Sequence, residues 1–594
     1  MCGIAGIVCK KEKFDLETQI KEMASILKNR GPDGEGFLLD KSEGVYLGHR
    51  RLSIIDLSER ANQPLFNEDK SLALVFNGEI YNYIELRDEL IAGGHKFISS
   101  TDSEVLLHGW EEWGLSLFEK INGMFAFCIY DRVKKEMILA RDNIGIKPLY
   151  YLDSPGIFAF ASESRAFYPL RGRFWKPGIN DNILRQMLLF QYVIDKEETL
   201  YAQVKKLPAG HYLYYKEDAA EVKPYWTVRV NPGYSRLKFE EAVRECDEQF
   251  NRSIKWQLRS DVPVGILLSG GLDSSLVTAV ATRHARQVNT FTATFDHKLD
   301  ERSYAKRCSE YLGTNHAEFN IDPLSINNRI EEIIKYYDDL SSFDGGVFTI
   351  YLMAEKIREF NIKVLLVGEG SDELFGGYSW FGLSQAPFRY MPGILRSAAY
   401  HYAVSRQFSG WKNIKHSLYM HKIISAFREK DIFRQVSRFE IEHQLPNHFL
   451  MKVDHGTMAH SLEARVPYLD KELVGLAFSL PGEFKLKGSF FNFNKNNEKF
   501  ILREVARKYL PPDIYGRKKR GFSIPIELVL KSNRDKVRDY LISSGSIART
   551  FYSHKEIDGL FTFKNRLYSP VHKQKEFILW RLFLLDVWKR NYLN

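Results

Sequence analysis

The segment that most constrains the fold is residues 262–275, which read VPVGILLSGGLDSS. Its first part, Val262–Leu268, is short and apolar, as is typical of a buried strand. A turn with two adjacent glycines follows, and the apolar run Leu276–Ala281 then suits the start of a helix. Backbone N–H groups, serine hydroxyls and the helix dipole at such a junction favour an anion. The pattern predicts a phosphate-binding loop that is not a Walker A loop, since no Gly-Lys-Ser/Thr follows. An ordinary glycine turn is the alternative.

The chain after this loop alternates between strand and helix patterns. We expect strands at Thr290–Phe295, His316–Ile321 and Lys363–Val367, and a helix at Ala305–Leu312. Such alternation predicts a parallel sheet with helices on both faces, and ligands bind at the carboxyl ends of its strands. The acidic segment Gly368–Glu373 follows the last of these strands, so it should face the same site as the serine–glycine turn. Its carboxylates suit Mg²⁺ or an amine.

Size and composition indicate a multidomain globular protein. The chain has 594 residues, which is long enough for more than one domain. Its apolar share is 44%, and no apolar run reaches the length of a membrane span. The start, MCGIAGIVCKK, lacks the basic region and the apolar length of a signal peptide. We therefore expect a cytoplasmic protein without a membrane partner.

The cysteines and the basic residues exclude several classes of site. The five cysteines are scattered without a CxxC pair, which argues against a zinc site and against a disulfide framework. The net charge of +9 is modest and spread along the chain, so no nucleic-acid partner is predicted. The run Arg517–Arg520 is the exception. Such runs usually form a solvated surface, and a specific anion role is the alternative.

The N-terminal region carries groups that suit an attack on glutamine. Cys2 follows the initiator Met, and removal of Met1 would leave a thiol beside a free α-amine that can act as its base. A guanidinium at Arg51 suits an α-carboxylate, and Glu79 with Asp102 suits an α-ammonium. The side-chain amide of Asn77 and the N–H of Gly78 could bind the oxyanion of a tetrahedral intermediate.

With these groups in place, the N-terminal region resembles a class II glutamine amidotransferase domain. The motifs that carry the resemblance are MCGIAGI, RGPDGEG, HRRLSIID, FNGEIYNY and RDNIGIKPLYY. It implies an α+β N-terminal-nucleophile hydrolase fold (αββα) over residues 2–215, with Cys2 as the nucleophile and Asn77 and Gly78 as the oxyanion hole. The implied glutamine-binding residues are Arg51, Leu52, Ser53, Ile54, Ile55, Asn77, Gly78, Glu79 and Asp102. We interpret Arg141–Tyr151 as a structural corner of a sheet, and we expect Ala161–Arg165 near the domain interface.

Residues 235–594 resemble the ATP-pyrophosphatase domain of glutamine-hydrolysing asparagine synthetases, an α/β parallel-sheet fold with additional helices. The resemblance implies that ATP adenylates a carboxylate and that ammonia from glutamine displaces AMP to give an amide, with Mg²⁺ at the phosphates. It implies ATP contacts at Leu268, Ser269, Gly270, Gly271, Asp273, Ser274, Ala293, Val367 and Gly368. Asp273 and Asp372 are the implied metal ligands, and Glu369 and Lys499 the implied catalytic residues. We expect Glu463, Arg465 and Asp470 to form a structural ion network under this site.

Three departures from the family pattern concern the acceptor acid. Leu340 and Ser341 replace a common Glu-Pro pair, Val367 replaces a Ser or Thr, and Asp454-His455 replaces Asp-Arg. We expect these changes to line the acceptor pocket. Aspartate is the acceptor that the family implies, and the alternative is another acid, such as a sugar uronic acid of surface polysaccharide assembly. A third hypothesis is a non-catalytic binding or regulatory protein. The resemblance also implies a homodimer and an apolar ammonia channel between the two sites.

Overall fold

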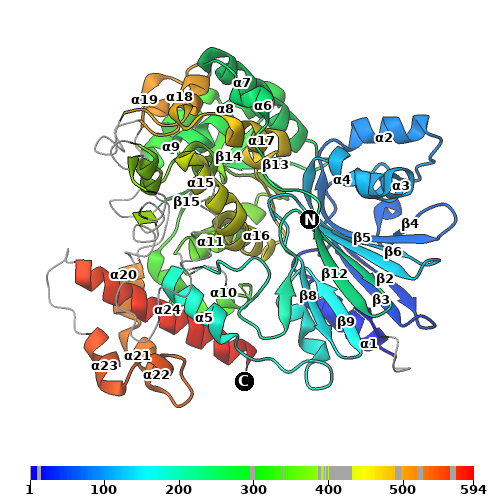
Figure 1. Ribbon diagram of the computed structural model, residues 1–594. Helices are drawn as coiled ribbons and strands as arrows, with labels where there is room; N and C mark the ends of the chain where they lie inside the picture. The colour runs from blue at the N-terminus through cyan, green and yellow to red at the C-terminus, as the bar shows by residue number, and fades with distance from the viewer. Residues whose placement is uncertain are drawn as a thin grey trace.

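The structure is a computed structural model, in which the two halves of the chain lie side by side (Figure 1). The residues that it describes are 2–9, 15–190, 192–294, 301–337, 339–340, 343, 345–385, 390–392, 395, 399–400, 431–488, 497–517, 526–561 and 570–593. Ser341 and Lys518–Arg520, which the sequence singled out, lie outside them.

The N-terminal half contains two antiparallel six-stranded sheets. The first sheet has the strand order β10 (Val204–Lys206), β8 (Tyr150–Ser154), β9 (Ile157–Ala161), β1 (Gly3–Val8), β3 (Val45–Arg51), β2 (Gly34–Asp40). The second has the order β12 (Ala219–Pro224), β11 (His211–Lys216), β7 (Glu136–Arg141), β6 (Gly123–Asp131), β5 (Leu72–Ile80), β4 (Leu65–Phe66). Since β1 is a central strand, the N-terminal cysteine is held at its end.

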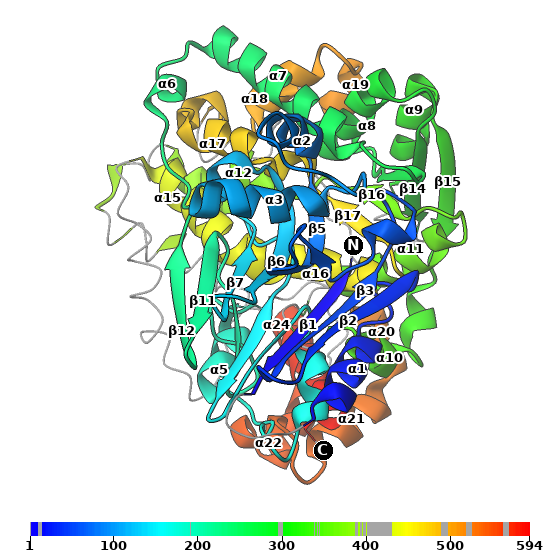
Figure 2. The same ribbon diagram turned by 90° about the vertical axis from the view of Figure 1, so that its right-hand side faces the viewer.

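Alternating side chains divide each of these strands between two cores. On β5, Ala73 and Val75 face the core between the sheets, whereas Leu74 and Phe76 face the core under α2 (Tyr83–Ala92) and α3 (Ser103–Trp113). The outer face of the first sheet packs against α1 (Glu17–Ile26), as Figure 2 shows. Helix, sheet, sheet and helix therefore form four layers, which confirms the predicted αββα fold class.

The C-terminal half is built on a five-stranded parallel sheet. Its order is β15 (Asn315–Asn320), β14 (Asn289–Thr294), β13 (Val264–Leu267), β16 (Val364–Leu366), β17 (Glu463–Arg465). Every neighbouring pair is parallel. The four strands expected from the sequence are therefore present within one or two residues of their predicted ends. The charged edge strand β17 had been interpreted only as an ion network.

Helices surround the parallel sheet and extend the domain beyond it. Those described along the chain are α5 (Asp181–Phe190), α6 (Pro232–Ser235), α7 (Phe239–Gln257), α8 (Leu272–His284), α9 (Arg302–Leu312), α10 (Ile330–Ile334), α11 (Gly346–Arg358), α12 (Ser371–Phe375), α15 (Ile432–Phe439), a π-helix (Glu440–Phe449), α16 (Leu450–Met458), α17 (Lys471–Ser479), α18 (Phe500–Ala506), α19 (Pro512–Tyr515), α20 (Ile526–Ser532), α21 (Arg534–Ile542), α22 (Ala548–Phe551), α23 (His554–Leu560) and α24 (Pro570–Tyr592). The terminal helix α24 returns to α5, where Arg581 donates a hydrogen bond to the carbonyl of Leu188 at 2.7 Å. None of these helices combines the length and the apolar character that a membrane span requires.

Phe158 offers a test of the packing between the two N-terminal sheets. Its buried ring lies on β9 and stacks on Tyr215 of β11 at a centroid distance of 4.4 Å. Phe158→Ala should lower the free energy of unfolding by about 3–5 kcal/mol, because two hydrogen-bonded sheets cannot collapse onto the cavity. Val133→Ala, at a position that is 74% exposed, should change this free energy by less than about 0.5 kcal/mol. Urea denaturation of both variants measures the difference, and equal effects would contradict the layered core.

Candidate functional site

Cys2 lies where β1 begins and is held from the second sheet. Its backbone N donates a hydrogen bond to Oδ1 of Asn77 at 3.0 Å. Burial raises the pKa of the Cys2 thiol, while the Leu52 backbone and the charge of Arg51 act in the opposite direction. A thiol of raised pKa needs a base to become a nucleophile. The α-amine that removal of Met1 would expose is the same nitrogen atom that Asn77 now holds.

Asn77, one of the two predicted oxyanion-hole residues, lies beside Cys2, and Gly78 follows it on β5. Asn77 is fully buried, and its Nδ2 has no hydrogen-bond partner among the described atoms. A buried donor without a partner is costly unless a ligand accepts its hydrogen bond. At Gly78 any Cβ would come within 2.1 Å of the Met124 carbonyl, so only glycine fits there. The structure thus places an available donor next to the thiol.

The predicted carboxylate clamp is built around the buried guanidinium of Arg51. Carbonyl oxygens hold it in place, among them that of Ser58 at 2.7 Å and that of Asp56, and Asn62 Oδ1 accepts at 3.0 Å. All of these partners are neutral, so the positive charge remains available for a carboxylate. The segment also reaches the other domain, because the carbonyl of Ile54 accepts a hydrogen bond from the backbone of Asp261 at 2.9 Å.

The two acidic residues predicted to hold an ammonium differ in their surroundings. Asp102 is buried, and its Oδ2 accepts a hydrogen bond from the Ile80 backbone at 2.8 Å. Burial raises the pKa of Asp102 to about 6. Glu79 instead lies 3.4 Å from the guanidinium of Arg465, which belongs to β17 of the other domain. Asp102 is therefore the better placed of the two to receive an α-ammonium.

A cavity of about 420 Å³ opens at the carboxyl ends of β13 and β16, where the sequence predicts nucleotide binding. The predicted residues that line it are Leu268, Ser269, Gly271, Asp273, Ser274, Ala293, Val367, Gly368, Glu369, Asp372 and Lys499. Gly270 does not line it. That residue makes the turn with φ of 68°, and a Cβ there would lie 2.5 Å from the Tyr304 backbone.

Lys499 joins the two acidic motifs of this cavity. Its Nζ lies 2.7 Å from Oδ2 of Asp273 and 2.6 Å from Oδ1 of Asp372. Burial lowers the pKa of Lys499, but the two carboxylates outweigh it and the net shift is upward. Both predicted metal ligands therefore converge on one cationic centre. Carboxylate oxygens that converge in this way are the hard donors that Mg²⁺ prefers, so the residues fit that ion.

Other charged residues of the cavity were not identified from the sequence. Arg517 donates a hydrogen bond to the carbonyl of Ser269 at 3.1 Å and pairs with Glu301. The interpretation of Arg517 as part of a solvated surface is therefore wrong. The sequence signal that could have identified it was its place in a basic run, for which an anion-binding role was the alternative. Lys452 also lines the cavity, and its charge opposes the burial that raises the pKa of Glu369.

Of the described residues that depart from the family pattern, only Val367 lines this cavity. Leu340 is buried outside it, and Asp454 and His455 are also absent from its lining. The expectation that all of these changes line an acceptor pocket is therefore wrong. The physical reason for Asp454 is clear, because α16 turns this side chain toward the N-terminal domain, where it pairs with Arg30 at 2.8 Å.

The ion network predicted from the motif after α16 spans the domain interface. Arg465 pairs with Glu463 at 2.6 Å and approaches Glu79 of the N-terminal domain. Asp470 is not part of it. Its Oδ1 instead accepts backbone hydrogen bonds at the start of α17, and its Oδ2 accepts one from Asn122 at 2.8 Å.

The structure also places the two segments for which the sequence predicts a structural position and no chemistry, Arg141–Tyr151 and Ala161–Arg165. Asp142 accepts hydrogen bonds from the backbone of the turn after β7, including Gly145 at 2.7 Å, which confirms the structural corner. Glu163 contacts the same Arg30 that pairs with Asp454, so the expected interface position of Ala161–Arg165 is also confirmed.

Comparison with known proteins adds independent support. A glutamine amidotransferase domain family matches residues 1–226, and an asparagine synthase family matches residues 245–590. The chain is 33% identical to a protein of Bacillus subtilis named asparagine synthetase [glutamine-hydrolyzing] 1, over 94% of this chain and 92% of that one. It is 32% identical to asparagine synthetase [glutamine-hydrolyzing] 2 of Arabidopsis thaliana, over 88% of this chain and 78% of that one.

The asparagine synthase match extends over more than half of the chain. The bacterial relative matches almost from end to end, so both halves occur together and in the same order. The chain therefore belongs to the glutamine-hydrolysing asparagine synthetase family, which joins a glutamine amidotransferase domain to an ATP-dependent, amide-forming ligase domain.

Proposed function

We propose that the protein converts aspartate to asparagine, with glutamine as the nitrogen source and ATP as the activating substrate. The observation that carries the proposal is the cavity in which the serine–glycine loop, Glu369 and Lys452 meet. The alternative acceptor, a sugar uronic acid, uses the same mechanism. With either acceptor, we assign residues 2–215 to the glutaminase domain and residues 235–594 to the synthetase domain.

The glutaminase half would use residues around Cys2. Arg51 would bind the α-carboxylate of glutamine and Asp102 its α-ammonium. The α-amine of Cys2 would take the thiol proton, and the sulfur would attack the amide carbon to give an oxyanion that Asn77 and Gly78 stabilise. The protonated α-amine would return this proton to the amide nitrogen, which leaves as ammonia, and water would then hydrolyse the thioester to glutamate and the free thiol.

The synthetase half would activate the acceptor by adenylation. The acceptor carboxylate attacks the α-phosphorus of ATP, and the bond to pyrophosphate breaks. Lys499 would hold negative charge on the phosphates, and backbone N–H groups of the serine–glycine loop would donate to them. Asp273 and Asp372 would hold Mg²⁺, which when bound screens the phosphate charge. Ammonia attacks the acyl carbon, AMP leaves, and Glu369, with its raised pKa, is placed to take the released proton.

The two additional charged groups of aspartate favour it over a uronic acid as the acceptor. Aspartate brings an α-carboxylate and an α-ammonium besides the carboxylate that reacts. Lys452 offers a cation for the first, and Glu373 offers an anion for the second, and both side chains line the same cavity. A uronic acid has one carboxylate, the one that reacts, and otherwise hydroxyl groups, so it brings no second carboxylate and no ammonium to these side chains.

We further propose the homodimer, the cytoplasmic location and the ammonia channel that the family resemblance implies. Among the described residues, only those of the C-terminal domain line the nucleotide cavity. A channel would therefore have to cross the interface between α16, β17 and the N-terminal sheets.

A panel of carboxylic acids tests the acceptor. With ATP, Mg²⁺ and ammonium present, pyrophosphate release should be at least about tenfold faster with aspartate than with glutamate or glucuronate, because only aspartate places both charged groups and the reacting carboxylate at once. Release with glucuronate and not with aspartate would establish the alternative. No release with any acid, while ATP still binds, would support a non-catalytic protein.

The pKa of Asp102 predicts the pH dependence of glutamine use. Since burial raises this pKa to about 6, Asp102 loses its charge as the pH falls through that value. The kcat/KM for glutamine should then fall by about a further tenfold per pH unit below 6, beyond the loss caused by protonation of the Cys2 α-amine, because the protonated acid no longer attracts an ammonium. Glutamate release between about pH 5 and 8 measures this, with Asp102→Asn as the variant that lacks the transition. A wild-type profile that falls no more steeply below pH 6 than the profile of Asp102→Asn would contradict the role of Asp102.

A further inference from the structure

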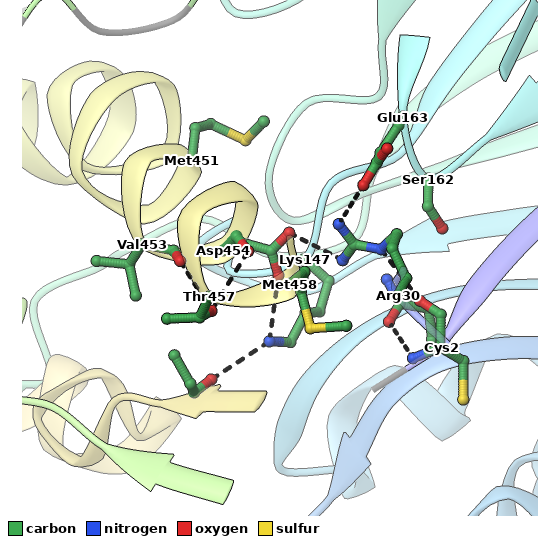
Figure 3. Close-up of polar contacts among 12 residues, drawn as sticks. Cys2, Arg30, Lys147, Ser162, Glu163, Met451, Val453, Asp454, Thr457 and Met458 are labelled. Carbon is green, nitrogen blue, oxygen red and sulfur yellow. Dashed lines mark hydrogen bonds and ion pairs between the residues drawn. The ribbon is translucent and has the colours of Figure 1, made fainter. Parts of the chain in front are cut away.

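A buried arginine connects the nucleophile to the synthetase domain. Nε of Arg30 donates a hydrogen bond to the backbone carbonyl of Cys2 at 3.2 Å. Its other nitrogens pair with Glu163 at 3.1 Å and with Asp454 at 2.8 Å (Figure 3). The guanidinium is completely buried, so these three acceptors define its position. A planar, rigid fork of donors transmits the position of its acceptors better than a flexible ammonium does.

Asp454 is the only one of these three acceptors that belongs to the synthetase domain. Its Oδ2 accepts from Arg30, and its Oδ1 lies 3.6 Å from Nζ of Lys147, another buried cation of the N-terminal domain. Lys147 also donates to the carbonyl of Ala464 in β17 at 3.4 Å. Removing one partner of such a buried group leaves uncompensated charge, so the arrangement strongly favours one relative position of the two domains.

Helix α16, which carries Asp454, is also a wall of the nucleotide cavity. Lys452 lines the cavity and lies two residues before Asp454. Two residues on an α-helix are separated by about 200° around its axis. The two side chains therefore leave α16 on opposite sides, one toward the nucleotide cavity and one toward Arg30. The thickness of α16 therefore separates the cavity from Arg30, which holds the Cys2 carbonyl.

We propose that Asp454 is a positioning residue for glutamine hydrolysis, supplied by the synthetase domain. It holds Arg30, and Arg30 fixes the backbone of Cys2 so that the thiol points at the amide carbon. The N-terminal domain is then fully competent only when it is docked on α16. This inference rests on the glutaminase half of the proposed function and is independent of the acceptor acid.

The test is glutamate release by Asp454→Asn in the full-length chain. The kcat should fall by at least about tenfold, because small displacements of a nucleophile have large effects on rate. The KM should stay within about twofold, because Arg51 and Asp102 are untouched. Asp470→Asn is the matched control, since it is an equally buried interface acid without a contact to Arg30. It should keep the wild-type kcat.

Alkylation of Cys2 by the glutamine analogue 6-diazo-5-oxo-norleucine separates positioning from folding. In Asp454→Asn the rate of labelling should fall, while the final extent should reach the wild-type value. Arg30→Lys, which keeps the charge but loses the fork, should show the same pattern. An unchanged kcat in both variants would overturn the proposal, as would a loss of kcat that matches a loss in the extent of labelling. If the wild type released no glutamate and bound no label, the proposed function itself would fail.

Discussion

Charged side chains buried between the two domains determine how the glutamine site lies relative to the nucleotide cavity. Arg465 reaches Glu79 from β17, while Arg30 and Lys147 reach Asp454 from the opposite direction. Buried ions tolerate little displacement, because each one depends on partners at hydrogen-bond distance. The relative position of the two sites in one chain therefore depends on this interface.

Short sequence patterns predicted the strands and turns whose conformation depends mainly on consecutive residues. The apolar strand before Ser269, the glycine turn at Gly270 and the parallel direction of β13, β14, β15 and β16 all follow from short segments. The placement of Asn77 and Gly78 beside Cys2 was also predictable, although from family motifs, since these residues are far apart in the sequence and meet only when the two sheets pack.

Long-range contacts explain what the sequence did not reveal. The strand β17 consists of Glu463–Arg465, and two charged residues of three do not resemble a buried strand until their partners are known. Arg517 looked like part of a solvated basic run because nothing local indicates its contact with Ser269. For the same reason, the sequence alone predicts an acceptor-side position for the pair Asp454-His455, whereas Asp454 faces the N-terminal domain. A helix next to a cavity has two faces, and its sequence does not say which one meets the ligand.

The transfer of nitrogen between the two sites is the central claim, and isotopic labelling tests it most directly. The enzyme would be given glutamine labelled with ¹⁵N at the side-chain amide, together with ATP, the acceptor acid and an excess of unlabelled ammonium. Mass spectrometry of the product amide then measures the origin of its nitrogen. We predict that the label in the product far exceeds its share of the free ammonia in solution. A product whose label equals that share would contradict direct transfer and would reduce the chain to two independent enzymes.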